Sequence, residues 1–341
     1  MNKCSPEEAI ATNDHIIDVR SPKEFLHSHI PQAINVPILD DYSHKEVGTV
    51  YRQMGKEAAI TRGLELTHPV LGEIYRRLDQ LPGRLILYCD RGGMRSQSIA
   101  HLLQAFGRDV CIIDGGYKAY RELVLRRMAE EVRRRTFVVL QGNTGVGKTK
   151  ILQALEGEGY GILDLEDLAH HAGSVFGHIA FSGDQPSQKQ FENVLFQRLL
   201  ELPSIVLSER ESRKIGRLHL PDSLYRSIAH AKHILLSTSM ENRVTTILED
   251  YHPEWKVHLP QLKEAIDQLK VRLSTAVTEE LKRSIEQEDF EPVIRYLMEH
   301  YYDPLYQRSL KQQDNDYILK CHFETREEAI EQIKNIINHL S

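Results

Sequence analysis

Short apolar runs alternate with helix-like spacings along the first third of the chain. Residues 14–20 are predicted to form a short buried strand that ends in charge, and residues 84–89 contain the apolar run of another strand. Residues 96–106 have helical spacing, and residues 109–113 form another apolar run. Apolar runs without alternation are typical of parallel strands that are covered on both faces. The pattern therefore predicts an α/β domain over residues 1–122.

The same pattern continues after a charged helical stretch. A linker helix is expected over residues 123–135, and a second α/β domain over residues 136–341. Strands of the second domain are predicted at 136–141, 160–164, 204–209 and 232–237. From about residue 241 the spacing is mostly helical, with one strand expected at 317–323. The second domain should therefore be a parallel sheet with a helical C-terminal extension.

The charge balance limits the partners that the whole surface can attract. The 341 residues include 43 Lys and Arg against 49 Asp and Glu, a net charge of −6. A nucleic-acid partner would therefore need a local basic patch. Residues 121–135 carry six Arg and three Glu, which favours an amphipathic linker helix slightly over a nucleic-acid contact.

The cysteines and the N-terminus indicate a cell compartment. The four cysteines form no CxxC pair and are too widely spaced for a zinc site or a disulfide framework. Free thiols fit a reducing compartment. The first residues lack the apolar stretch of a signal peptide, and no apolar run is long enough to span a membrane. We therefore predict a soluble cytoplasmic protein without a membrane partner.

A cysteine stands at the point where a buried strand meets a helix. A loop that curls into a helix N-terminus directs backbone N–H groups at one spot, and this field, with two nearby arginines, favours a nucleophilic thiolate. The alternative is a buried structural thiol, which is the interpretation we prefer for Cys111. Cys89 is the predicted catalytic residue. The predicted active-site loop around it consists of Arg91, Gly92, Gly93, Arg95 and Ser96.

A second motif follows the first strand of the second domain. It fits the G-x-x-x-x-G-K-[ST] pattern of a phosphate-binding loop, and a helical stretch comes after it, as that motif requires. Backbone N–H groups would hold phosphate oxygens, the lysine would add a charge, and the threonine hydroxyl could hold Mg²⁺. The predicted phosphate-binding residues are Gly142, Asn143, Thr144, Gly145, Val146, Gly147, Lys148 and Thr149.

An acidic partner for this loop is less regular. Glu209 and Glu211 follow the strand at 204–209, but Ser208 interrupts the apolar run that usually precedes such an acid. ATP hydrolysis therefore does not follow from the motif, and the loop could hold another diphosphate. Glu209, Glu211 and Arg213 form the predicted acidic and anion site. The neighbouring Arg210, Lys214 and Arg217 are equally consistent with a solvated face or an anion-binding surface.

Three segments in order resemble a rhodanese domain: DHIIDVRSPKEFLHSHIPQAINVP, YCDRGGMRS and IIDGGYKAY. The pairing of such a domain with a phosphate-binding loop resembles the tRNA 2-selenouridine synthase family. The likeness extends over nearly the whole chain through further segments, namely DLEDLAHHAGSVFG (164–177), QPSQKQFEN (185–193), SERESRKIG and YYDPLYQRS (301–309). It implies an N-terminal rhodanese-like domain and a P-loop NTPase-like C-terminal domain, with Asp18 and Arg20 as scaffold.

The resemblance also implies a reaction. The substrate would be the wobble 2-thiouridine of tRNA, which is geranylated on sulfur by geranyl diphosphate and then converted to 2-selenouridine by selenophosphate. Cys89 would handle the chalcogen. No tightly bound cofactor and no resident metal are expected, although Mg²⁺ could accompany the diphosphate. A selenophosphate-supplying enzyme is a further candidate partner, and the oligomeric state is not predicted.

Two other functions fit the same motifs. One is an ATP-dependent sulfurtransferase, which the irregular acidic strand disfavours. The other is a non-enzymatic sulfur-relay or tRNA-binding adaptor, in which Cys89 would accept sulfur while no modified nucleoside forms. ATP turnover and the nucleoside products distinguish the three.

Overall fold

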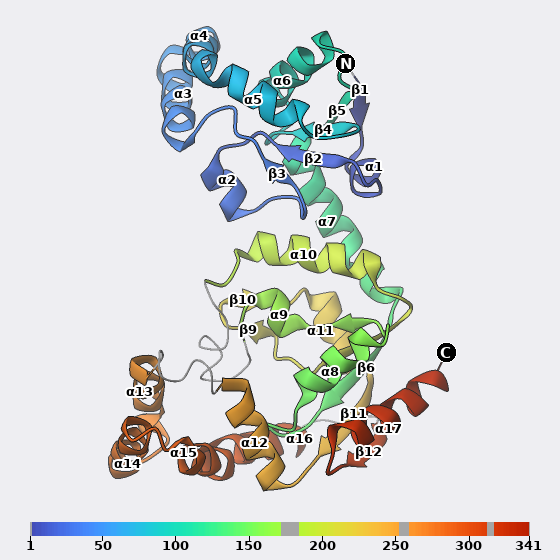
Figure 1. Cartoon of the computed structure of the whole chain (residues 1–341), viewed down its shortest axis with the longest axis vertical. Helices are drawn as coiled ribbons and strands as arrows, with labels where there is room; N and C mark the ends of the chain where they lie inside the picture. The colour runs from blue at the N-terminus through green and yellow to red at the C-terminus, as the bar shows by residue number, and fades with distance from the viewer. Residues whose placement is uncertain (1, 172–183, 252–258, 312–316, 341) are drawn as a thin grey trace. The chain divides into compact units, whose positions relative to one another are not determined.

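The chain contains two compact units, each built on a five-stranded parallel sheet. The computed structural model describes residues 2–171, 184–251, 259–311 and 317–340 (Figure 1). The first unit contains residues 1–128 and 186–197, and the second contains residues 129–185 and 198–341. The predicted α/β class with two parallel sheets is confirmed.

The sheet of the first unit has the order β1-β5-β4-β2-β3. Its strands are β1 (Asn2–Cys4), β2 (His15–Asp18), β3 (Ile34–Asn35), β4 (Leu85–Tyr88) and β5 (Val110–Ile113). All four residues of β4 and of β5 are buried, which agrees with their unbroken apolar sequences. The edge strand β1 was not predicted, because its three residues contain no apolar run.

Helices cover this sheet. They are α1 (Pro6–Ile10), α2 (Pro22–His27), α3 (Asp41–Met54), α4 (Lys56–Thr67), α5 (Leu71–Asp79), α6 (Met94–Ala105), α7 (Gly116–Arg133) and the first part of α10 (Gln188–Glu201) (Figure 1). Helix α2 begins where the sequence suggests, because Ser21 and Glu24 form a reciprocal capping box. The segment expected as a separate linker helix is the C-terminal part of α7, which already begins at Gly116.

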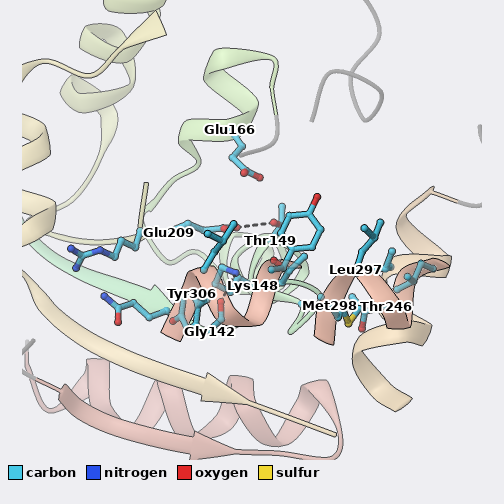
Figure 2. Close-up of a pocket in the computed structure, with 18 of the residues that line it drawn as sticks. Gly142, Lys148, Thr149, Glu166, Glu209, Thr246, Leu297, Met298 and Tyr306 are labelled. Atoms are coloured by element: carbon cyan, nitrogen blue, oxygen red, sulfur yellow. Dashed lines mark hydrogen bonds between the residues drawn. The ribbon is translucent and has the colours of Figure 1, made fainter. Parts of the chain in front are cut away.

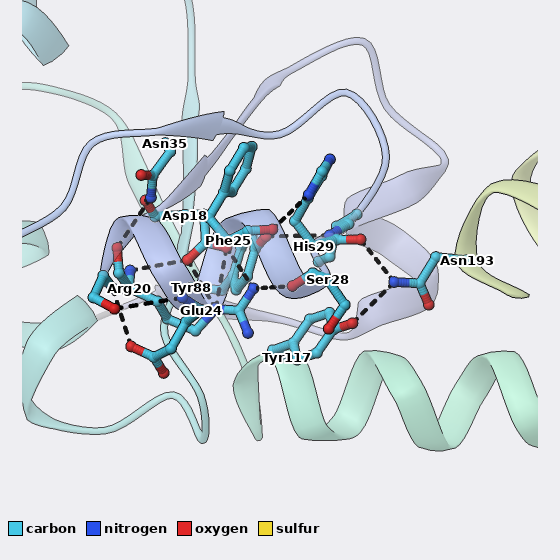
Figure 3. A network of polar contacts seen from close by, with 12 residues as sticks. Asp18, Arg20, Glu24, Phe25, Ser28, His29, Asn35, Tyr88, Tyr117 and Asn193 are labelled. Atoms are coloured by element: carbon cyan, nitrogen blue, oxygen red, sulfur yellow. Dashed lines mark hydrogen bonds and ion pairs between the residues drawn. The ribbon is translucent and has the colours of Figure 1, made fainter. Parts of the chain in front are cut away.

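A buried ion pair organises the first unit (Figure 3). Arg20 Nη2 lies 2.6 Å from Asp18 Oδ2, and both side chains are almost fully buried. The same nitrogen donates to the Ser28 carbonyl at 2.7 Å. The guanidinium also lies over the Tyr117 ring, 4.0 Å from its centre. This pair therefore connects the end of β2 with the loop after α2 and with the start of α7.

Helix α10 supplies further polar partners to this network (Figure 3). The Asn193 amide donates to the His29 carbonyl at 2.7 Å and to the Tyr117 hydroxyl at 2.9 Å. The Gln190 side chain accepts from the His29 backbone N–H at 2.8 Å. Asn193 is fully buried, so its hydrogen bonds are protected from water. Residues far along the chain therefore complete the first unit.

The sheet of the second unit has the order β12-β11-β6-β8-β7. Its strands are β6 (Thr136–Gln141), β7 (Ile162–Leu163), β8 (Ile205–Glu209), β11 (Lys232–Ser237) and β12 (Tyr317–His322), and β9 (Lys214–Ile215) pairs with β10 (Leu218–His219) as a separate hairpin. Its flanking helices are α8 (Lys148–Gly157), α9 (Leu165–Ala169), α11 (Asp222–Ala229), α12 (Met240–Tyr251) and α17 (Arg326–Asn338).

A helical extension with its own core precedes β12. It consists of α13 (Leu259–Gln268), α14 (Thr275–Glu286), α15 (Phe290–Leu297), a π-helical turn η3 (Met298–Tyr302) and α16 (Asp303–Lys311). Buried residues of these helices pack together with Val244 of α12. The predicted helical C-terminal part is confirmed. Within the described residues, no helix is long and apolar enough to cross a membrane.

We predict that Asp18→Ala strongly destabilises the protein. The substitution leaves the Arg20 guanidinium buried without its counter-charge, which typically costs about 3–5 kcal/mol. Urea unfolding followed by circular dichroism should show this loss in the transition of the first unit. Asp114→Ala is the matched control, since Asp114 pairs with Lys3 on the surface and should matter little. Equal unfolding midpoints for the two variants would contradict the role of the buried pair.

Candidate functional site

The Cys89 loop occupies the carboxyl end of β4. Cys89 follows the strand directly, and α6 begins five residues later at Met94. The Cys89 Sγ accepts a hydrogen bond from the Gly93 backbone N–H at 3.2 Å and another from the Ser96 hydroxyl at 3.3 Å. The thiol therefore lies at a helix N-terminus with two donors aimed at it. That arrangement can stabilise negative charge on sulfur or on a chalcogen bound to it.

Two glycines let this loop pack closely against the turn after β5. Gly116 has φ +60°, and a β-carbon there would lie 2.3 Å from the Cys89 carbonyl oxygen. Gly92 has φ +64°, and a β-carbon there would lie 2.8 Å from the Ile113 carbonyl oxygen. The Tyr117 backbone N–H donates to the Cys89 carbonyl at 2.9 Å. The start of α7 therefore fixes the backbone of the cysteine loop.

The two arginines of the loop have different surroundings. Arg95 forms a two-pronged ion pair with Glu24, at 2.7 and 3.2 Å, and Glu24 also lies 3.7 Å from His44 Nδ1. Arg91 is largely exposed and lies 3.5 Å from Asp90. Its exposed guanidinium leaves Arg91 accessible to a substrate anion, whereas the Arg95 guanidinium is already held by a carboxylate.

The phosphate loop occupies the carboxyl end of β6, which is the central strand of its sheet. Gly145 and Gly147 have φ values of +81° and +84°, so the backbone curls in a way that other residues adopt only with strain. Helix α8 then begins at Lys148, whose Nζ donates to the Gly142 carbonyl at 3.1 Å. This strand, glycine-rich loop and helix give the geometry that collects backbone N–H groups around an anion.

The neighbouring strand brings an acid to this loop. Because β8 pairs directly with β6, Glu209 lies opposite Leu140, and Glu209 Oε1 accepts a hydrogen bond from the Thr149 hydroxyl at 2.7 Å. Figure 2 shows this contact, with Glu166 facing it across the cavity. Ser208, which interrupts the apolar run of β8, has a structural role. Its hydroxyl donates a hydrogen bond to the carbonyl of Leu163 in β7 at 2.7 Å.

Carboxylates surround the polar end of the cavity. Burial, with the nearby charges of Glu166 and Glu209, raises the pKa of Glu211 well above its usual value. Burial also raises the pKa of Asp164 to about 6, although Asp164 caps α9 by accepting from the Asp167 N–H at 2.9 Å. Arg213 is more exposed, pairs with Asp222 at 3.2 Å, and lies 5.1 Å from the centre of the Tyr225 ring.

A cavity of about 730 Å³ opens beside the phosphate loop. Its polar end contains the loop residues and the three glutamates, whereas the helical extension forms an apolar wall. Figure 2 shows Glu166 and Glu209 on one side of the loop, and Leu297 and Met298 on the other. The apolar lining consists of Ile247, Leu262, Ile285, Phe290, Val293, Ile294, Leu297, Met298 and Leu305. Such a site suits a ligand with an anionic head and an apolar chain.

The sequence motifs did not indicate this apolar wall. Its residues come from six different elements of the second unit, and each of these helices alone has the pattern of an ordinary core helix. The signal in the sequence is the spacing of Val293, Ile294, Leu297 and Met298, which places four apolar side chains on one helix face. Of the segment 164–177, residues 172–177 lie outside the described residues.

The geometry defines the class of protein: a cysteine-loop domain joined to a phosphate-loop domain with an apolar ligand cavity. The family model "Rhodanese-like domain" matches residues 6–123. The family model "tRNA 2-selenouridine synthase AAA domain" matches residues 135–336. The chain therefore belongs to the tRNA 2-selenouridine synthase family, as its motifs predicted.

Curated relatives support this membership. A tRNA 2-selenouridine synthase of Nitrosomonas europaea is 40% identical over 246 residues, covering 69% of this chain and 63% of the relative. Those of Shewanella halifaxensis and Shewanella woodyi are 33% and 30% identical. The S. halifaxensis alignment covers 93% of this chain and 95% of the relative, and the S. woodyi alignment covers 98% of both.

We predict that Asp164→Asn stabilises the protein at neutral pH but not in acid. The folded state holds the Asp164 proton up to a pKa of about 6, whereas the unfolded chain releases it near pH ~4. The stability of the wild-type protein therefore falls as pH rises between these values. Asparagine cannot ionise, yet it still caps α9. The gain should grow to ~2 kcal/mol at pH 7. If the unfolding free energies of the wild-type protein and Asp164→Asn change in parallel with pH, the prediction is wrong.

Proposed function

We propose that this protein converts the wobble 2-thiouridine of tRNA to 2-selenouridine through an S-geranyl intermediate. The observation that carries the proposal is the composition of the cavity in the second unit. A phosphate loop opens directly onto an apolar wall, so the site offers one end to a diphosphate and the other to a hydrocarbon chain.

The size of the cavity agrees with such a ligand. If each carbon of the chain occupies the volume of a liquid water molecule, ~30 Å³, a ten-carbon chain needs ~300 Å³. The cavity of about 730 Å³ therefore has room for the chain, the diphosphate and part of an acceptor base. The acceptor base must reach the carbon that is bonded to the diphosphate. That carbon would lie at the boundary between the polar and apolar ends of the cavity.

In the first step, the sulfur of 2-thiouridine attacks C1 of the geranyl group. The C1–O bond breaks, diphosphate leaves, and the base loses its N3 proton. Lys148 and the loop N–H groups would hold the departing charge. The Thr149 hydroxyl and the Glu209 carboxylate, 2.7 Å apart, would suit Mg²⁺, which takes its other ligands from water and the diphosphate.

In the second step, selenium replaces the S-geranyl group, which leaves more readily than a thiocarbonyl sulfur. We propose that the Cys89 thiolate attacks the phosphorus of selenophosphate, so that the P–Se bond breaks, the phosphoryl group passes to the Cys89 sulfur and selenide leaves. The selenide then attacks C2 of the base and displaces geranyl thiolate, and water hydrolyses the phosphocysteine to Cys89 and phosphate. The Gly93 N–H and the Ser96 hydroxyl would stabilise the anion on the way.

We predict that Cys89→Ser abolishes selenation and leaves geranylation intact. Serine keeps the shape of the side chain, but its hydroxyl is a far weaker nucleophile than a thiolate. Purified protein, thiolated tRNA, geranyl diphosphate and selenophosphate should be incubated together, and the nucleosides measured by mass spectrometry. The S-geranyl nucleoside should accumulate in the variant. Cys4→Ser, in β1, is the matched control. Normal selenouridine formation by Cys89→Ser would refute the role of Cys89.

We predict that Lys148→Ala weakens geranyl diphosphate binding by about 10–100-fold, because a charged hydrogen bond to the diphosphate is lost. Titration calorimetry measures this directly. Lys334→Ala is the control, since Lys334 pairs with Glu158 at 2.8 Å and does not line the cavity. An affinity equal to that of the wild-type protein would exclude the phosphate loop as the diphosphate site. ATP turnover without any nucleoside product would favour a nucleotide-dependent enzyme instead.

A further inference from the structure

One backbone carbonyl of the phosphate loop is held from outside the cavity. Arg243, on α12, donates from Nε to the Thr144 carbonyl oxygen at 2.9 Å. Arg243 is buried, with 6% of its surface exposed. Neither Arg243 nor its ion-pair partner Asp303 lines the cavity, so both act on the loop and not on its ligand.

Holding this carbonyl sets the direction of an N–H group. A peptide bond is planar and trans, so the Thr144 C=O and the Gly145 N–H point in opposite directions. When Arg243 fixes the carbonyl on the outer side of the loop, the Gly145 N–H is directed to the inner side, where a phosphate would bind. Without that contact the peptide could rotate at little cost, because Gly145, with φ +81°, tolerates a wide range of backbone angles.

Helix α12 and the helical extension support the same peptide by packing. A β-carbon on Gly145 would lie 2.9 Å from the Arg243 carbonyl oxygen, 3.0 Å from Ile247 Cδ1 and 3.1 Å from Met298 Cε. Ile247 and Met298 also line the apolar part of the cavity. The outer side of the loop therefore rests on the residues that would contact a hydrocarbon chain.

Asp303 fixes the direction of the Arg243 guanidinium. Its two carboxylate oxygens accept from Nη1 at 2.9 Å and from Nη2 at 2.7 Å. The Arg243 side chain is 7% exposed and that of Asp303 is 17% exposed, so water competes little for this pair. Because the ion pair holds Nη1 and Nη2, it fixes the plane of the guanidinium. The Nε–H bond then points toward the Thr144 carbonyl oxygen.

We propose that Arg243 and Asp303 are positioning residues that hold the phosphate loop in its anion-binding conformation through the Thr144–Gly145 peptide. The proposal rests on the proposed function in one respect, that the loop binds a diphosphate. It makes diphosphate affinity depend on the first residue of α16, although that residue never touches the ligand.

The test is calorimetric titration of the full-length protein with inorganic pyrophosphate, which has no hydrocarbon chain. Asp303→Asn should raise the Kd about tenfold, the equivalent of one charged donor lost from the site. Arg243→Lys should do the same, because an ammonium cannot make the fork and the Nε contact together. Asp303→Glu keeps the charge and should remain within about threefold of the wild-type Kd. Thermal unfolding of each variant identifies any that fail to fold.

A spectroscopic measurement separates positioning from a general structural role. Thr144-Gly145 is the single Thr-Gly pair in the sequence, so ¹³C-carbonyl threonine with ¹⁵N-glycine labelling isolates the Gly145 amide signal. Pyrophosphate should move this amide proton downfield in the wild-type protein and less than half as far in Asp303→Asn. Arg295→Gln is the control, because Arg295 pairs with Glu291 at 3.1 Å on α15 without touching the loop. Its titration and its Gly145 signal should match the wild-type protein.

The outcomes distinguish this proposal from the proposed function. If the wild-type protein binds pyrophosphate but not geranyl diphosphate, the geranyl substrate is wrong and the positioning test still applies. Equal pyrophosphate affinity and equal Gly145 shifts in the wild-type protein, Asp303→Asn and Arg243→Lys would overturn the positioning role. Absence of pyrophosphate binding by the wild-type protein would overturn both.

Discussion

The hydrogen bonding of a central parallel strand is the constraint on which both candidate sites depend. β4 and β6 each pair with a neighbour on both sides, so the chain can leave only at the carboxyl edge and must turn at once into a helix. Glycines with positive φ make that turn, and the turn gathers N–H groups at a helix N-terminus. The Cys89 loop and the phosphate loop therefore share one backbone geometry.

The ligand site of the second unit combines local and distant information. The loop at the polar end of the cavity is encoded in eight consecutive residues, 142–149, because backbone conformation there follows from glycine placement. The apolar end comes mainly from residues about 100 to 160 positions later in the chain. The polar end of the cavity is therefore a local property of the sequence, whereas the apolar end depends on tertiary packing.

This division explains what the sequence could predict. The buried strands β4, β5, β6, β8 and β11 were found because each is a continuous apolar run. β1 was not, because it is recognisable only through its pairing with β5. Helix α3 was not predicted, and none of its residues is buried. The Thr149–Glu209 contact and the Arg243–Asp303 pair join residues 60 positions apart, and spacing along a chain cannot indicate such distances.

The position of α10 has a consequence for the evolution of this two-domain chain. Residues 186–197 belong to the compact first unit, where Asn193 binds His29 and Tyr117, and Glu192 pairs with Arg121. A gene split after α7 would leave the rhodanese-like part without these buried partners. Fission into two independent polypeptides would thus require a compensating helix, so selection for stability alone should keep the two halves in one gene.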